Sequence, residues 1–174
     1  MSSLSKGVGK VEVSLRWDPS PLGEPAHDLD LVAATYTVDE PHGDPAYAVH
    51  FDSRSPDGTI TLTRDSQTGQ GFGADEVLTL EFERLAATYG RVVVGVVIQQ
   101  RDRRRAFSDV NNTVVRIAEG PTELWKSTLS EVPHSTAAVV AEFVRGESGT
   151  WLFHETVRGL DTDPEAFIGL MGRN

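Results

Sequence analysis

The segment RDSQTGQGFGADE, residues 64–76, concentrates oxygen ligands and glycines in one loop. The side chains that can supply oxygen are those of Asp65, Ser66, Gln67, Thr68, Asp75 and Glu76. Gly69 and Gly71 leave the backbone free to turn its carbonyl groups inward. Hard cations bind several oxygen atoms, and calcium accepts irregular geometry more readily than magnesium does. The loop therefore predicts a calcium site, and the alternative is an acidic, solvated hairpin.

A second pair of carboxylates stands in the segment DLD, where Asp28 and Asp30 mark the change from a loop to a strand. Residues two apart in an extended chain point to the same side. Two like charges held so close are costly unless a positive charge lies between them. The pair is therefore a second candidate for metal ligation. The alternative is a loop cap at Asp28 and an exposed strand residue at Asp30.

Catalytic chemistry has no matching set of residues. The chain has no cysteine, which excludes disulfides, thiolate zinc sites, iron–sulfur clusters and cysteine nucleophiles. Its five histidines show no i, i+4 pair and no zinc spacing. The segment GESG, residues 146–149, departs from the G-x-S-x-G pattern of hydrolases, and no phosphate-binding glycine loop opens a helix. We therefore expect a protein that is not an enzyme.

Short strands must position the candidate ligands. In VEVSLRW, residues 11–17, apolar and polar side chains alternate, as in a half-buried strand. The continuous apolar run of residues 91–100 predicts a central strand buried on both faces, and Gly95 within it indicates a bulge or close packing. Further strand-like segments are residues 29–38, 46–51, 59–63, 77–82, 113–117, 123–129, 136–146 and 150–157.

The segment DTDPEAFIGLM, residues 161–171, predicts a short carboxy-terminal helix. Asp163 is placed to cap it, Pro164 suits its first position and Glu165 suits its first turn. Many short strands separated by turn signals favour an all-β fold, a two-sheet β-sandwich. A chain of 174 residues fits one such domain, so we expect a single domain over residues 1–174.

The charge balance restricts the partners. A net charge of -10 disfavours nucleic acid and anionic lipid surfaces and suits a cationic partner. The one concentrated basic stretch, RDRRRAF at residues 101–107, is interpreted as an exposed hairpin tip. No segment approaches the ~20 apolar residues of a membrane span, and the amino terminus lacks a signal-peptide pattern. We expect a cytoplasmic protein without membrane insertion.

Taken together, the motifs resemble the TerD family of tellurium-resistance and stress-response proteins. The family order and approximate spacing are matched by HDLDLVAATYTV, SPDG, the loop of residues 64–76, RVVVGVVI, FSDVNNTVVRI and residues 123–159. The segment LSKG, residues 4–7, also looks like the opening of that family. The resemblance covers nearly the whole chain.

The resemblance implies a β-sandwich that binds one or two calcium ions through loops at one edge, with no established catalysis. It further implies a role in resistance to tellurite and other stresses. We expect the protein to act there as a sensor or scaffold, with another protein of a stress-response complex as its partner. Carried over by position, the metal ligands are Asp28, Asp30, Asp65, Ser66, Gly69, Gly71, Asp75 and Glu76.

Two departures from the family pattern bear on this site. Typical members have Gly-Asp-Asn where this chain has Arg64, Asp65 and Ser66, and two consecutive aspartates where it has Ala74 and Asp75. One carboxylate and one amide oxygen are lost, which predicts weaker binding or the loss of one of two ions.

Two alternatives follow. The first is a protein–protein interaction module with a degenerate metal site. The second is calcium-dependent carbohydrate binding, for which Trp17 and Phe72 are the nearby aromatic residues in the sequence.

Overall fold

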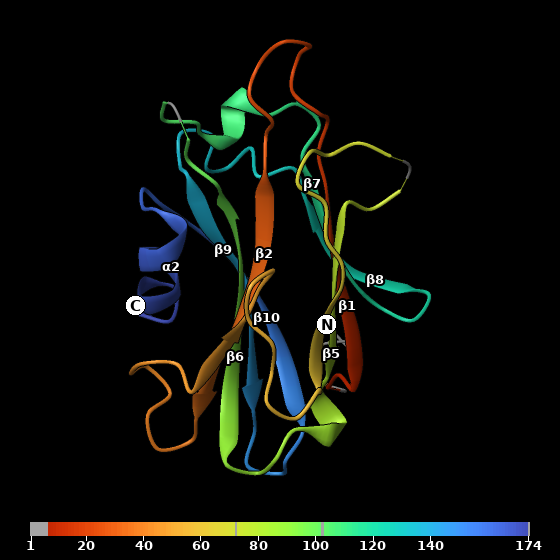
Figure 1. Cartoon of the computed structure of the whole chain (residues 1–174). Coiled ribbons are helices and arrows are strands. Elements are labelled where there is room, and N and C mark those ends of the chain that lie inside the picture. The colour runs from red at the N-terminus through yellow and green to blue at the C-terminus, as the bar shows by residue number, and fades with distance from the viewer. Residues whose placement is uncertain (1–6, 72, 102, 174) are drawn as a thin grey trace.

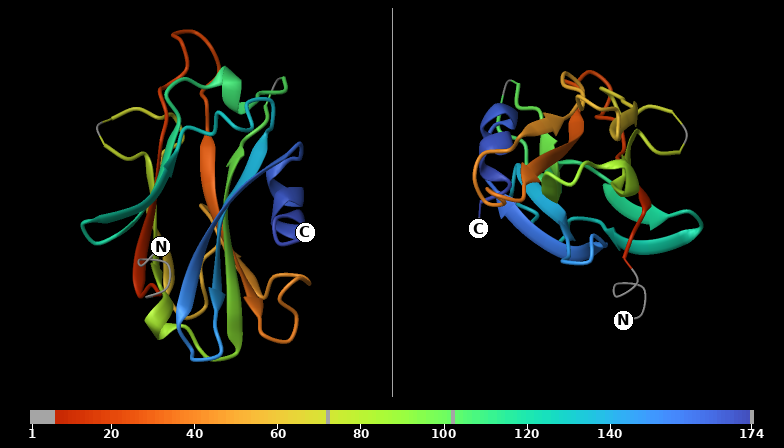
Figure 2. Two further views of the ribbon diagram at one scale, coloured as in Figure 1. Left: turned by 180° about the vertical axis from the view of Figure 1, so that it is seen from behind. Right: turned by 90° about the horizontal axis from the view of Figure 1, so that it is seen from below.

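A computed structural model describes residues 7–71, 73–101 and 103–173 of the chain. Two five-stranded antiparallel sheets pack face to face, and a short helix lies on the outer face of one of them (Figures 1 and 2). The predicted two-sheet β-sandwich with a carboxy-terminal helix is confirmed. Phe72, named above as a carbohydrate-stacking candidate, lies outside the described residues, as does most of the segment LSKG.

The first sheet, sheet A, has the strand order β10-β9-β6-β2-β3. Its strands are β2 (Leu29–Thr37), β3 (Tyr47–Val49), β6 (Tyr89–Ile98), β9 (Ala137–Arg145) and β10 (Trp151–Leu160). The second sheet, sheet B, has the order β4-β5-β1-β7-β8. Its strands are β1 (Lys10–Arg16), β4 (Ile60–Arg64), β5 (Glu76–Glu81), β7 (Val114–Glu119) and β8 (Thr122–Ser127). Two single-turn 3-10 helices lie between strands: η1 (Phe82–Arg84) between β5 and β6, and η2 (Phe107–Asp109) between β6 and β7.

The alternation in β1 is reproduced in its burial. Val11, Val13 and Leu15 are fully buried between the sheets, whereas Glu12 is exposed. Period-two alternation puts one side of a strand into the core and the other into solvent. Trp17 follows directly and is also buried, so the chain leaves β1 still anchored in the core.

The central strand β6 is buried on both faces, as its apolar run predicts. Val92 and Val94 belong to the core between the sheets, and Val93 and Val97 belong to a second cluster on the outer face of sheet A. That outer face is covered by α2 (Pro164–Leu170), as Figure 2 shows. Phe167 of α2 is fully buried in the second cluster. A sheet covered on two sides needs apolar residues at consecutive positions.

The predicted start of α2 is confirmed. Asp163 accepts a hydrogen bond from the backbone N–H of Ala166 at 2.8 Å, and Pro164 occupies the first turn. The side chain of Asp163 thereby satisfies one of the amide groups that a helix leaves unpaired at its amino terminus. The part of the chain that the structure describes contains no helix long and apolar enough to cross a membrane.

The strand β3 is shorter than its sequence pattern suggests. It pairs with Ala33, Ala34 and Thr35 of β2, and the described residues place no strand beside residues 29–32 on that side. Leu29 pairs with Ile98 at the end of β6 on the other side. The first residues of β2 therefore form an open edge at the upper end of the sandwich in Figure 1.

The basic stretch of residues 101–107 is not the exposed hairpin tip that the sequence suggested. It connects β6 to η2, and the side chain of Gln100 closes this connection by bonding both the N–H and the C=O of Arg105. Arg105 is only 4% exposed, and its Nη1 lies 3.4 Å from Nε2 of His27. Arg101, Arg103 and Arg104 are exposed, as expected, but the stretch is not a hairpin because β6 and the next strand, β7, belong to different sheets. Basic composition alone does not show that the connection folds the side chain of Arg105 inward.

The contact of Gly95 with α2 leads to a first prediction. A Cβ at Gly95 would lie 2.5 Å from the Phe167 ring and 2.9 Å from the backbone oxygen of Ala138. We expect Gly95→Ala to lower the free energy of unfolding by about 1–3 kcal/mol through overpacking. Urea denaturation measures this change. The matched control is Gly169→Ala on the open side of α2, where a Cβ meets nothing within 4 Å. This control should be neutral or slightly stabilising, by up to ~1 kcal/mol.

Candidate metal centre

Three buried carboxylates meet at the open edge of β2. Asp28, Asp30 and Glu76 each offer an oxygen atom, and these atoms lie within 4.8 Å of one another. The exposed fractions of the three residues are 6%, 3% and 0%. Asp28 and Asp30 come from the start of β2 in sheet A, and Glu76 comes from the start of β5 in sheet B. The fold thus unites two segments that are 46 residues or more apart in the sequence.

Glu76 is held by the edge that β3 leaves open. Its Oε1 accepts a hydrogen bond from the backbone N–H of Leu31 at 2.8 Å. In a longer sheet this amide would donate to a neighbouring strand, so the carboxylate takes the place of a strand partner. The other oxygen, Oε2, is buried and has no hydrogen-bond partner. That oxygen is free to bind a ligand.

The two aspartates have different neighbours. Asp30 Oδ2 accepts a short hydrogen bond of 2.6 Å from Nε2 of Gln99. Asp28 Oδ2 lies 3.4 Å from the Nη2 atom of Arg101, and Asp28 Oδ1 is buried without a partner. The cluster therefore contains two buried carboxylate oxygens without a hydrogen-bond donor, one on Asp28 and one on Glu76. A protonated Glu76 can share its proton with the neighbouring carboxylates of Asp30 and Asp65.

The electrostatics of the cluster favour a cation. Burial raises the pKa of Asp28 to about 7, with the charge of Asp30 as the second cause. Burial also raises the pKa of Glu76 to about 11, again with Asp30 as the second cause. The pKa of Asp30 is raised by burial as well. A positive ion among these groups stabilises their charged forms and offsets the cost of keeping them buried.

Asp65 lies beside the cluster. It is exposed just after the end of β4, and its charge contributes to the raised pKa of Asp28 and of Asp30. The fold thus brings four of the eight predicted ligands into one neighbourhood: Asp28, Asp30, Asp65 and Glu76.

The other predicted ligands of the loop make local structural contacts. Asp75 Oδ2 accepts from the backbone N–H of Trp17 at 2.8 Å, and Ser66 Oγ accepts from the N–H of Gly69 at 3.1 Å. Gly69 is packed so closely on Trp17 that a Cβ would lie 2.5 Å from Nε1 of the indole. Gly71 has a φ of 113°, and a Cβ at this position would lie 3.6 Å from Nη2 of Arg64. These contacts fix the loop to β1 and to the core.

Comparisons with known proteins identify the family of the chain. The sequence model of the TerD domain matches residues 1–168. The chain belongs to the TerD family. It is 27% identical over 160 residues to the tellurium resistance protein TerD of Alcaligenes sp, which covers 88% of this chain and 82% of that protein. It is 25% identical over 159 residues to general stress protein 16U of Bacillus subtilis (strain 168), covering 88% and 82%.

The fold is shared with solved structures of the TerD family. The crystal structure of a homologue of telluride resistance protein (TerD) from Streptomyces coelicolor A3(2) superimposes with a TM-score of 0.93. The two sequences are 52% identical, and the match covers 95% of this chain and 98% of the other.

Sequence reasoning missed two residues that contact the carboxylate cluster, Gln99 and Arg101. Both follow the apolar run of β6, whose end lies beside the start of β2 in the antiparallel pair. The polar pair Gln99 and Gln100 directly after a run buried on both faces was the available signal. Its use required knowing that β2 and β6 are neighbours.

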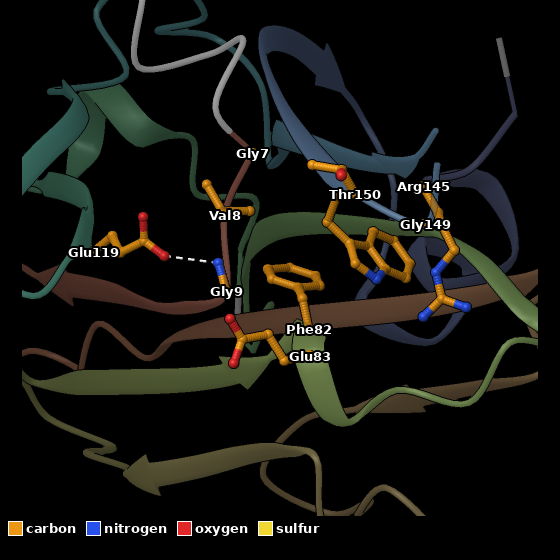
Figure 3. Close-up of a pocket in the computed structure, with 10 residues that line it drawn as sticks. Gly7, Val8, Gly9, Phe82, Glu83, Glu119, Arg145, Gly149 and Thr150 are labelled. Carbon is orange, nitrogen blue, oxygen red and sulfur yellow. Dashed lines mark hydrogen bonds between the residues drawn. The ribbon is translucent and has the colours of Figure 1, made fainter. Parts of the chain in front are cut away.

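At the end of the sandwich opposite the carboxylate cluster, a hollow of about 460 Å³ lies beside η1 (Figure 3). Glu119 Oε2 accepts from the N–H of Gly9 at 2.7 Å, and Val8 donates its N–H to Trp151. Arg145 donates to the carbonyl groups of residues 85 and 86 and stacks over the Trp151 ring at 4.8 Å. These groups fasten the start of the described chain between the two sheets.

The buried carboxylates predict how the stability of the metal-free protein depends on pH. The pKa of Asp28 is 3.8 when unfolded and about 7 when folded, so between these values only the folded state keeps the proton. The free energy of unfolding should therefore fall as the pH rises through this window. Urea denaturation in chelator measures it. Asp28→Asn should make the slope less steep without removing it, because Glu76 and Asp30 also have raised pKa values in the folded state. Asp39→Asn, at an exposed site, should leave the slope unchanged. A slope that is the same in both variants would exclude Asp28 as the cause.

Proposed function

We propose that this TerD-family chain is a non-enzymatic calcium-binding protein of the tellurite-resistance and stress-response type, acting as a sensor or scaffold. One observation carries the proposal. Asp28 Oδ1 and Glu76 Oε2 are buried oxygens without a partner, inside a cluster of three carboxylates. Buried polar atoms almost always have a partner, and an unsatisfied one calls for an explanation such as a bound ion.

The donor set fits calcium. Asp28, Asp30 and Glu76 would form the inner side of the site, and Asp65 would close it from solvent. All four offer carboxylate oxygens, which hard cations prefer, and water can complete the six to eight ligands that calcium typically takes. This set supports one ion. Asp75, Ser66, Gly69 and Gly71 would act by holding the loop in place.

Calcium at this position would join the two sheets. Its ligands come from β2 of sheet A and β5 of sheet B, and Asp65 begins the loop of residues 65–75. An ion that neutralises these charges would hold Asp65, at the start of the loop, against the two sheets and present the loop as a surface, in the way that calcium sensors couple binding to recognition. The partner would be another protein of a stress-response complex in the cytoplasm.

The stress role is supported by relatives named for tellurium resistance and general stress. Direct reaction with tellurium compounds would call on thiols, and this chain has no cysteine. We therefore assign it an indirect part in resistance.

One contact favours a second candidate, an interaction module with a degenerate metal site. The guanidinium of Arg101 lies 3.4 Å from Asp28 Oδ2 and already supplies a positive charge there. In this alternative Arg101 substitutes for part of the ion's charge, and the sandwich binds its partner without calcium.

A thermal melt of chelator-stripped protein separates the two candidates. Calcium at about a thousand times its dissociation constant stabilises by ~4 kcal/mol, and each kcal/mol shifts the melting temperature by roughly 2–4 °C in a domain of this size. We expect a calcium-specific rise, with magnesium as the control ion. Folded protein that shows no rise at millimolar calcium would refute the calcium proposal.

Variants test whether the calcium-specific rise in melting temperature comes from the cluster of Asp28, Asp30 and Glu76. Glu76→Gln should abolish it while keeping the chelator-stripped melting temperature near that of the parent, because the amide resembles the protonated carboxyl that burial favours. Glu83→Gln removes an exposed carboxylate at the other end of the sandwich and should keep the full rise. Equal rises in both variants would place the calcium elsewhere.

Arg101 provides a further prediction. Its charge opposes a cation at Asp28, so Arg101→Gln should tighten calcium binding about two- to fivefold, the effect of one exposed ion pair. Isothermal titration calorimetry measures the dissociation constant. Arg103→Gln, an exposed arginine of the same connection, is the matched control and should change it little. Unchanged affinity in Arg101→Gln would show that Arg101 does not compete with the ion.

A further inference from the structure

A pocket of about 280 Å³ opens on the outer face of sheet A, next to the metal centre. It lies between the turn that follows β3 and the first turns of α2, and Asp30 forms part of its lining. The pocket is distinct from the hollow at the other end of the sandwich, which fastens the start of the described chain.

The floor of this pocket is aliphatic. Val32 of β2 and Val97 of β6 are almost fully buried on the outer face of sheet A, and Ile168 of α2 is partly buried beside them. These three side chains belong to or pack on the cluster that joins α2 to the sheet. Such a floor gains free energy by removing an aliphatic chain from water.

The rim of the pocket is acidic. Asp52 and Glu165 are exposed and belong to two different elements, the turn after β3 and the first turn of α2. None of the described lining residues is Lys or Arg. Phe51, which also lines the pocket, is 52% exposed and offers an aromatic face to a cation.

We propose that this pocket binds an aliphatic ammonium group. The hydrocarbon chain would lie on Val32, Val97 and Ile168, and the charged end would stay at the rim near Asp52 and Glu165. Long cationic side chains bind in this manner, with the stem on apolar surface and the charge in water. The net charge of -10 attracts such a ligand from a distance.

Two sources share this chemistry: a lysine side chain of a partner protein and a free alkyl amine. A lysine docking here would contact α2 and the turn after β3 together. The pocket adjoins the proposed calcium site, but its aliphatic floor and rim charges stand without an ion. Experiments in chelator therefore test this proposal independently of calcium.

The probe is hexylammonium, titrated in chelator at low salt and followed by protein-observed NMR. We expect saturable shifts at Val97 and Ile168, with affinity that weakens as salt is added. Hexanol, which has the same chain without the charge, should bind at least several-fold more weakly. Equal binding of hexanol, or no saturable shift at millimolar hexylammonium, would overturn the proposal.

Charge-removing variants assign the cation to the rim. The double variant Asp52→Asn, Glu165→Gln should weaken hexylammonium binding about tenfold, the effect of two exposed ion pairs. The control Asp39→Asn, Glu147→Gln removes two exposed charges outside the pocket and should change binding less than twofold. Equal losses in both double variants would mean that net charge alone attracts the probe, and the site would be rejected.

The source is identified with a blocked peptide that carries one central lysine. Binding of this peptide at the same residues, and its loss on acetylation of the lysine, would assign a protein partner. Binding of hexylammonium without the peptide would assign a free amine. Either result supports the pocket.

Discussion

The structure depends on how the unpaired backbone amide at the open edge of β2 is satisfied. The strand β3 ends early, so the backbone N–H of Leu31 has no strand neighbour and is satisfied by the carboxylate of Glu76. This one hydrogen bond brings a residue of sheet B against the start of sheet A. It also keeps the carboxylate of Glu76 fully buried next to Asp28 and Asp30. A cation bound among these carboxylates would offset the cost of burying them, which is why this edge is the candidate metal centre.

The helix α2 covers the apolar outer face of the same sheet. Sheet A is apolar on both faces at β6, and Phe167 of α2 covers the outer face opposite Gly95. The helix is short, so beyond its first turn it leaves a pocket over the outer ends of β2 and β6, beside the candidate metal centre. The pocket with its aliphatic floor is the uncovered remainder of this face. One short helix therefore accounts both for the sealed centre of sheet A and for its open end.

Most of the fold was predictable because period-two alternation, the apolar run of β6 and the cap at Asp163 are local signals. The pairing of Asp28 with Asp30 was also local, since residues two apart in a strand share a side. Asp75 and Glu76 show the limit. They are neighbours, and one carboxylate bonds Trp17 while the other bonds Leu31. Adjacent strand residues point in opposite directions, but only the strand order shows which direction leads to the cluster.

The bond between Glu76 and Leu31 joins residues 45 positions apart and two sheets that must first dock. A contact of this kind is formed only after the entropy cost of closing the intervening loop has been met, so we expect it to be absent from the folding transition state. An interaction absent from the folding transition state changes the unfolding rate and leaves the folding rate nearly unaltered. A cation held at this junction would thus slow the unfolding of the sandwich. It would lengthen the lifetime of the closed sandwich without helping the chain to reach it.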